Sequence, residues 1–510
     1  MGRTELRRLL TGAMAVGLAV TPLAPVPAQA PARLPTTQSI SEADRALGQK
    51  ADPELSAEYG GVYSGSQSAV VRQVGLRVAG QSGVSDPADA FTFRLLNSGV
   101  PNAFAIPGGY AYITRGLLAL MNNEAELGFV LGHETGHITA RHYASRQKVT
   151  QRNVLIGTLG QTLLGAILGN GAAGNLGGQL GQAGIQRLVV GNVMSHSRAD
   201  EFAADDLGLN YAKRAGYDPS ASADILGALA AQSTLDTRIG GKARTTPSWA
   251  MSHPDPAARV VRARDRARII GAGGTRNGDA FLESLDGLLY GDDPAQGVIE
   301  GSTFRYPPGR VQFTVPVGYG MTNGTDAVTI TAAGSPAGTG QARFTGGNHA
   351  GDLAGMVNRA FRALDANNNA VSVTPRATRV NGMPAMTATT TAAGTNGAAL
   401  DVTVVAIEVS PTSAYAFAII QPRGRGLGDL APLVNGFRKM TDAEVAAVRP
   451  RVIDVVSVGP RDSVATLAAR MAFDTYKTER FLVLNNLPAG TTRLMQGRKV
   501  KLVVWGGPRS

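Results

Sequence analysis

The sequence of 510 residues predicts an α+β protein made of three successive folded domains. Through residues 31–290 the apolar positions recur mostly at helical spacing, which predicts a mainly helical domain with a small edge sheet. Residues 300–445 alternate strand-like segments with two helices, which predicts an α/β domain. Residues 452–505 follow the order strand, helix, helix, strand, which predicts a small βααβ domain.

Residues 1–30 have the pattern of a secretory signal peptide, because three arginines precede the apolar run LLTGAMAVGLAV. The following PVPAQA ends in small residues, so we expect cleavage after Ala30. The apolar run is too short for a transmembrane helix. We therefore expect an exported protein that is located in a bacterial periplasm.

Composition narrows both the chemistry and the partners. The chain has no cysteine, so it forms no disulfide and any transition-metal site must use His, Asp and Glu. Its formal net charge is +11, which suits an anionic partner such as the cell envelope. Aromatic residues make up only 5% and no basic–aromatic stripe occurs, so nucleic acid is not an expected partner.

The segment NAFAIPGGYAYITRGLLALM predicts a strand, a tight turn, a second strand and a helix. The helix after it contains LGHETGHITARH, residues 131–142. On a helix, His133 and His137 lie one turn apart on the same face and can hold one metal ion. Glu134 stands beside them, where it can act on a water molecule. This is the H-E-x-x-H pattern of zinc peptidases.

A catalytic zinc ion takes three protein ligands, so one more ligand is needed. One group of zinc peptidases continues as H-E-x-x-H-x-x-G-x-x-H, but here His142 falls one residue short and Ala140 replaces the glycine. The later helical segment SRADEFAADDLG offers Glu201 as the third ligand. Asp205, one turn further, can accept a hydrogen bond from a ligand histidine and fix its tautomer.

Four segments occur in order: NAFAIPGGYAYITRGLL, ELGFVLGHETGHITARH, SRADEFAADDLGLNYAKRAGYDP and SHPDPAARV. Together they resemble the HtpX-like and CAAX-prenyl-endopeptidase family of gluzincin metalloproteases, and especially its periplasmic BepA-like branch. The resemblance covers about residues 45–265. It implies a gluzincin fold and a zinc-dependent endopeptidase that hydrolyses misfolded or envelope proteins, with unfolded or outer-membrane proteins as substrates.

The resemblance also implies the roles of individual residues. Carried over by motif, His133, His137 and Glu201 bind one zinc ion per chain, and Glu134 is catalytic. The NAFAIPGG segment resembles the edge that binds substrate as an added strand. The residues of that substrate strand are Asn102, Phe104 and Ile106.

His253 lies in the SHP sequence, at the position of the family's HP motif. It could donate to the developing oxyanion, occupy the open zinc position and hold the enzyme latent, or be an ordinary loop histidine. Arg259 and Arg198 could form salt bridges with the helices or contact substrate. The histidines expected at structural or surface positions are His142, His196 and His349.

Residues 151–193 are apolar, glycine-rich and almost without charge. They predict either a mobile flap or a surface in peripheral contact with membrane or misfolded protein, or else a helical pair packed on the domain. The C-terminal segments SVATLAARM, LNNL and LMQGRKVKLV resemble a lysin-motif domain, which implies contact with peptidoglycan; a generic packing domain is the alternative.

For the whole chain, the alternative to an enzyme is a metal-holding, chaperone-like or cell-wall-binding scaffold with little proteolysis. The intact Glu134 favours the enzyme, because a metal site with a purely structural role needs no general base.

Overall fold

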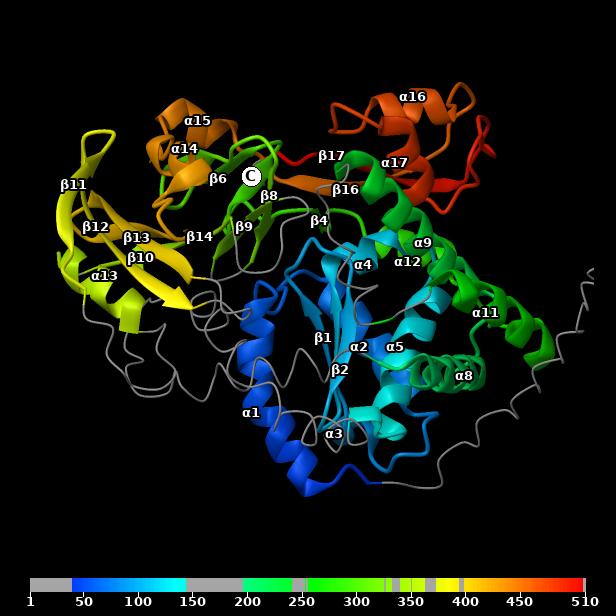
Figure 1. The fold of residues 1–510 in the computed structure, drawn as a ribbon. Helices are drawn as coiled ribbons and strands as arrows, with labels where there is room; N and C mark the ends of the chain where they lie inside the picture. Colours follow the sequence, from blue (N-terminus) through cyan, green and yellow to red (C-terminus); the bar gives the residue numbers. More distant parts are fainter. Residues whose placement is uncertain are drawn as a thin grey trace, which may run out of the picture. The chain divides into compact units, whose positions relative to one another are not determined.

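The structure is a computed structural model, drawn as a ribbon in Figure 1. The residues that it describes are 39–143, 196–240, 253, 256–324, 327–332, 340–349, 351–362, 373–393 and 399–507. The expected signal peptide with its cleavage site after Ala30, and the glycine-rich segment 151–193, lie outside the described residues.

The first region is mainly helical. Its helices are α1 (Glu42–Glu58), α2 (Gln67–Ala79), α3 (Pro87–Ala90), α4 (Arg115–Leu120), α5 (Glu124–Thr139), α8 (Arg198–Arg214), α9 (Ala221–Gly240), α11 (Pro256–Ile270) and α12 (Gly278–Ser284). Helix α5 is buried at every residue and packs against α2, α8 and α9, and Figure 1 shows α5 and α8 side by side. Polar side chains on α5 must therefore find their partners inside the protein.

A three-stranded sheet packs beside α2 and α5; its strands are β1 (Thr92–Leu96), β2 (Ala103–Ile106) and β3 (Tyr110–Thr114). The strand order is β1-β3-β2, with β1 parallel and β2 antiparallel to β3. Gly108 and Gly109 make the tight turn between β2 and β3 at φ 88° and 90°, where glycine costs least. In the described part of the chain, β2 is an edge strand that pairs with β3 alone.

The second region contains two antiparallel sheets. The larger has the order β11-β12-β13-β14-β10-β9-β8, and its strands are β8 (Tyr319–Asn323), β9 (Val328–Ala332), β10 (Gln341–Asn348), β11 (Arg376–Val380), β12 (Met383–Ala393), β13 (Ala399–Ser410) and β14 (Ser413–Pro422). The smaller has the order β15-β7-β6-β5, and its strands are β5 (Val298–Glu300), β6 (Thr303–Tyr306), β7 (Val311–Thr314) and β15 (Arg438–Lys439).

Two hydrophobic clusters cover the two faces of the larger sheet. One is rich in aromatic rings, among them Phe313, Phe344 and Phe417, and joins the two sheets. The other packs α13 (Leu353–Arg362) against β12 and β13 (Figure 1). The remaining short elements of this region are η2 (Gly428–Leu430), α14 (Ala431–Asn435) and α15 (Asp442–Ala447).

The last region consists of β16 (Arg451–Ser457), α16 (Val464–Ala469), α17 (Lys477–Leu484) and β17 (Lys499–Trp505). β16 pairs antiparallel with β17 and also with β4 (Leu289–Tyr290), in the order β17-β16-β4. The last region therefore shares its sheet with the stretch that follows the first region. The sequence predicts a self-contained unit here, because a strand of two residues such as β4 has no periodicity that would reveal the shared sheet.

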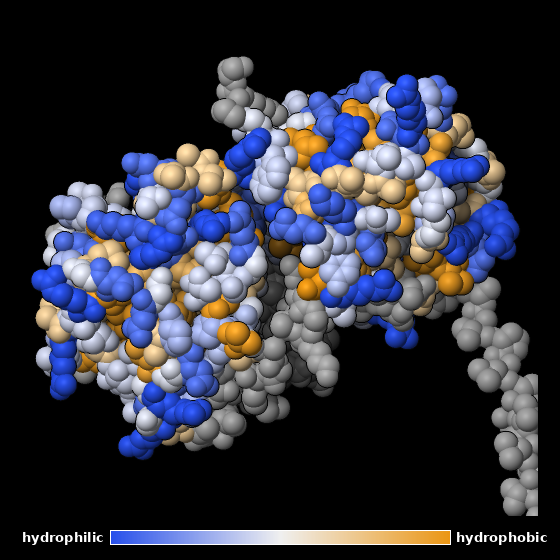
Figure 2. Space-filling view, turned by 90° about the horizontal axis from the view of Figure 1, so that it is seen from above, coloured by the Kyte–Doolittle hydropathy of each residue, from blue (hydrophilic) through white to orange (hydrophobic). Residues whose placement is uncertain are grey.

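Hydrophobic residues lie scattered among hydrophilic ones on the face of the molecule in Figure 2. Such mixing is ordinary for a surface in contact with water. Among the described residues, no helix combines the length and the apolar character needed to cross a bilayer.

A buried amine joins the last region to the segment in front of α5. Lys501 on β17 is fully buried, and its Nζ donates hydrogen bonds to the carbonyl oxygens of Ala119, at 2.7 Å, and of Met121. Burial lowers the pKa of Lys501 and raises the pKa of Glu126, in the first turn of α5. The end of α4 and the start of α5 thus depend on a residue from the opposite end of the chain.

We expect Lys501→Met to lower the free energy of unfolding by roughly 2–3 kcal/mol, because it removes two charge-assisted hydrogen bonds from buried carbonyl groups. Lys499→Met is the matched control, because Lys499 lies on the same strand but pairs with Glu283 at the surface. Urea unfolding measures both effects. Equal losses in the two variants would show that the buried contact contributes nothing specific.

Candidate metal centre and active site

Helix α5 carries the H-E-x-x-H residues. Asn123 caps its N-terminus by accepting a hydrogen bond from the backbone N–H of Glu126 at 3.0 Å, and the Glu126 carboxylate accepts from Asn123 Nδ2 at 2.7 Å. Each cap satisfies a polar group that burial would otherwise leave unpaired. From this start, the helical period brings His133 and His137 to the same face one turn apart, with Glu134 adjacent.

Helix α8 supplies two of its three buried carboxylates to this site. Ser197 begins the helix through a capping box, and Glu201 and Asp205 then follow one turn apart. α8 approaches α5 closely at Gly208, where a Cβ would lie 2.6 Å from the backbone nitrogen of His133. Only glycine permits this approach, which brings the carboxylates of α8 to the histidines of α5.

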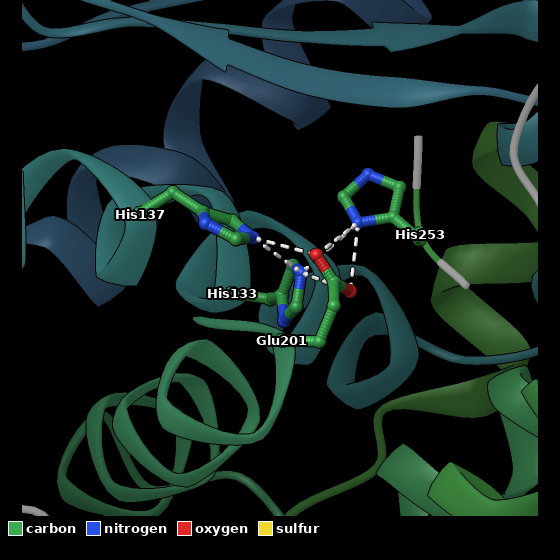
Figure 3. Close-up of side chains that lie close together, drawn as sticks. All are labelled: His133, His137, Glu201 and His253. Atoms are coloured by element: carbon green, nitrogen blue, oxygen red, sulfur yellow. Dashed lines mark hydrogen bonds and ion pairs between the residues drawn. The ribbon is translucent and has the colours of Figure 1, made fainter. Parts of the chain in front are cut away.

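Four side chains converge on one point (Figure 3). His133 Nε2 lies 3.0 Å from His137 Nε2, and each lies within 3.6 Å of a Glu201 carboxylate oxygen. His253 Nδ1 lies 3.0 Å from Glu201 Oε2 and 3.4 Å from His133 Nε2. Ligand atoms about 2.0–2.1 Å from a tetrahedral zinc ion stand about 3.3 Å from one another. The donor set and its spacing therefore fit zinc.

Arg259 of α11 pairs with the carboxylates of Glu201 and Asp205 on α8. This side chain is buried; its Nε and Nη2 donate to Asp205 at 2.9 and 2.6 Å, and its Nη1 lies 2.7 Å from Glu201 Oε2. Burial alone would raise the pKa of Asp205, but the guanidinium charge outweighs it and lowers that pKa to about 2. Asp205 Oδ1 also lies 3.0 Å from His133 Nδ1, where a carboxylate favours the tautomer with Nε2 free.

Glu134 and His137 have protonation properties suited to their places. Burial raises the pKa of Glu134, and its Oε2 has no hydrogen-bond partner among the described residues. Its Oε1 lies 3.7 Å from His253 Nε2. Burial lowers the pKa of His137 well below its ordinary value, so the imidazole is neutral, as a metal ligand must be.

Strand β2 brings to the cluster a backbone edge that pairs with no other strand in the described part of the chain. Because the Thr114 N–H donates to the carbonyl oxygen of Asn102, alternate residues from Asn102 onward direct their backbone groups to β3. Ala103 and Ala105 therefore direct theirs to the open edge, and His253 Nε2 lies 3.1 Å from the oxygen of Ala103. The side chains of the residues expected as the substrate strand are buried: Asn102, Phe104 and Ile106. The backbone groups at the edge belong to the residues between them, Ala103 and Ala105.

Two more histidines lie beside the cluster. His142 Nδ1 lies 2.9 Å from His137 Nδ1, and the ring of His196 stacks on that of His137 with centroids 3.6 Å apart. Both His142 and His196 are buried. His349 lies in the second region instead, where its Nε2 is 3.2 Å from the oxygen of Ser410. Sequence reasoning missed this role of His142, although its position five residues after His137 was a usable signal.

The structure thus places in one site every residue predicted as ligand, catalytic residue or supporting carboxylate: His133, Glu134, His137, Glu201, Asp205 and His253. Two histidines and a glutamate from two buried helices, with a second glutamate between the histidines, define the H-E-x-x-H class of metallopeptidases.

The comparisons agree with this class. The model of Peptidase family M48 matches residues 66–267 of this chain. The Beta-barrel assembly-enhancing protease of Yersinia pestis is 30% identical over 56% of this chain and 57% of its own length. Its Escherichia coli (strain K12) counterpart is 31% identical over 39% of this chain and 38% of its own.

The Mitochondrial metalloendopeptidase OMA1 of Schizosaccharomyces pombe is 28% identical over 42% of this chain and 59% of its own length. This chain therefore spans well under two thirds of these relatives. Residues after 267 lie beyond the family match.

We expect Arg259→Met to lower the free energy of unfolding of the metal-free protein by roughly 3–5 kcal/mol, because two buried carboxylates lose their cation. Arg262→Met is the matched control. Arg262 lies one turn further along α11 and pairs with Asp206, and its side chain is 18% exposed. The loss of unfolding free energy in this control is therefore expected to be smaller. Urea unfolding in the presence of a chelator measures both.

The same pair of proteins tests the pH dependence. The pKa of Asp205 is about 2 in the folded protein against an ordinary value of 3.8, so its contribution to stability is complete above about pH 4 and is lost as the pH falls toward 2. The difference in the free energy of unfolding between wild type and Arg259→Met should therefore become smaller below about pH 4. A difference that widens with acid would contradict this account.

Proposed function

We propose that this protein is a zinc-dependent endopeptidase that hydrolyses peptide bonds of misfolded or envelope proteins. The observation that carries the proposal is the convergence of His133, His137 and Glu201 on one point beside the buried Glu134. The names of the relatives, a metalloendopeptidase and a protease that enhances β-barrel assembly, support the same activity and favour outer-membrane proteins as substrates.

The residues of the chain divide the reaction between them. Zinc, when bound by His133, His137 and Glu201, supplies a Lewis acid for the scissile carbonyl and lowers the pKa of water. Glu134, with its pKa raised by burial, takes the proton of the attacking water and passes it to the leaving amine. The edge of β2 at Ala103 aligns an extended substrate as an added strand.

We further propose that His253 holds the site in a resting state. His253 Nε2 can donate to the oxygen of Ala103, and with a metal bound its Nδ1 would offer a lone pair beside the other ligand atoms. One side chain then covers both the metal position and the backbone edge that a substrate needs. The oxyanion-donor role for His253 is the alternative, and it predicts the opposite effect of removing the ring.

The location and the accessory regions belong to the same proposal. The signal-peptide pattern of residues 1–30 supports export to the periplasm. Residues 300–445 are proposed as an accessory domain whose role the proposal leaves open. Residues 452–505, through their resemblance to a lysin motif, are proposed to contact peptidoglycan.

We expect Glu134→Gln to reduce cleavage of unfolded casein about 100- to 10,000-fold while zinc affinity stays near the wild-type value, because Glu134 is not a ligand. A chelator should abolish wild-type cleavage, and added zinc should restore it. Equal cleavage by both proteins would indicate a contaminant. Zinc binding without any Glu134-dependent cleavage, also after His253 is changed, would favour the scaffold function.

We expect His253→Ala to raise the rate of casein cleavage, because the substitution opens the fourth metal position and frees the oxygen of Ala103. His349→Ala is the matched control, because His349 contacts Ser410 in the second region. Initial rates at equal zinc content decide the matter. A fall of about 100-fold for His253→Ala would instead assign this residue to the oxyanion.

A further inference from the structure

We propose that His142 is a positioning residue for the metal centre: its Nδ1 accepts the hydrogen bond from His137 Nδ1 that leaves His137 Nε2 free to bind the metal. The inference rests on the proposed zinc site. It adds a residue outside the H-E-x-x-H motif that acts through His137 and does not touch metal or substrate.

The proposed metal ligation by His137 decides which of the two Nδ1 atoms donates. The two Nδ1 atoms lie 2.9 Å apart, so one carries the proton and the other accepts it. His137 Nε2 faces His133 Nε2 at 3.0 Å and Glu201 Oε1 at 3.4 Å, and needs its lone pair for the metal. A neutral imidazole with Nε2 unprotonated carries its proton on Nδ1. His137 is therefore the donor and His142 the acceptor.

The backbone after α5 is shaped to bring His142 into this position. Helix α5 ends at Thr139, and Arg141 has φ 53°. This is the left-handed region, which residues other than glycine rarely adopt. This conformation turns the chain back toward the helix. A residue in this conformation is strained and persists where surrounding contacts require it. The contact of His142 with His137 is one such requirement, and the Arg141 pair with Asp44 at 3.1 Å is another.

The two ligand histidines thereby have different outer partners. His133 Nδ1 lies 3.0 Å from the Asp205 carboxylate, whereas His137 meets a neutral ring. The Nε2 of His142 in turn lies 3.9 Å from Asp200 Oδ1, in the first turn of α8. His142 therefore links the end of α5 to the start of the helix that carries the third ligand. His196, stacked on His137, restricts the ring from its face.

The test compares three variants of the full chain by zinc affinity, measured in competition with a chelator. His142→Leu removes the acceptor, and His142→Gln keeps a polar side chain but displaces the acceptor; we expect each to bind zinc about 10- to 100-fold more weakly. His142→Asn places its amide oxygen near the former Nδ1, and we expect affinity within about threefold of wild type. The visible spectrum of the cobalt-substituted proteins should change with the first two variants and be restored in the third.

The outcomes separate the inference from the proposed function. Wild-type affinity in both His142→Leu and His142→Gln would overturn the positioning role. Equal weakening of zinc binding in all three variants would make His142 a structural residue. A fall from two zinc ions per chain in the wild type to one in the variants would make His142 a ligand. A wild type that binds zinc but cleaves nothing would overturn the proposed protease activity. The zinc affinities of the variants would still test the positioning role of His142. A wild type without zinc affinity would overturn both.

Discussion

The buried guanidinium of Arg259 is the constraint on which the rest of the site depends. It pairs with Asp205 and Glu201 together, at 2.6 and 2.7 Å, in a place where burial opposes the charge of each carboxylate. In the proposed metal site, an ionised Glu201 is the third ligand and an ionised Asp205 orients His133. Because Arg259 comes from α11, the centre is complete only when α5, α8 and α11 are packed together.

Around this centre the protein assigns separate tasks to separate elements. Helices hold the side chains of the proposed metal site, since a buried helix fixes its residues more firmly than a loop. The short sheet contributes the backbone of β2, at the edge that pairs with no other described strand. His253 precedes α11 in the chain and contacts both Glu201 and the oxygen of Ala103, so the proposed metal binding and substrate alignment meet at one side chain. Any rearrangement of that short segment changes the two functions together.

The sequence predicted most of the residues that the structure brings together here, because they lie on helices where spacing determines direction. His133, His137, Glu201 and Asp205 follow from two pairs one turn apart. The partner of His142 could not be predicted in this way, because it depends on the left-handed backbone at Arg141. The strand register was also out of reach: the free edge falls to Ala103 and its alternates, which the turn at Gly108–Gly109 decides.

The contact of Lys501 with Ala119 and Met121 has a consequence for the order of events during synthesis. The donor and the acceptors are separated by 382 and 380 residues, so a ribosome completes the peptidase region long before it makes the lysine. Until then the junction in front of α5 lacks these two hydrogen bonds. The first region thus finishes assembling only after the C-terminal segment that carries Lys501 has been made and has folded.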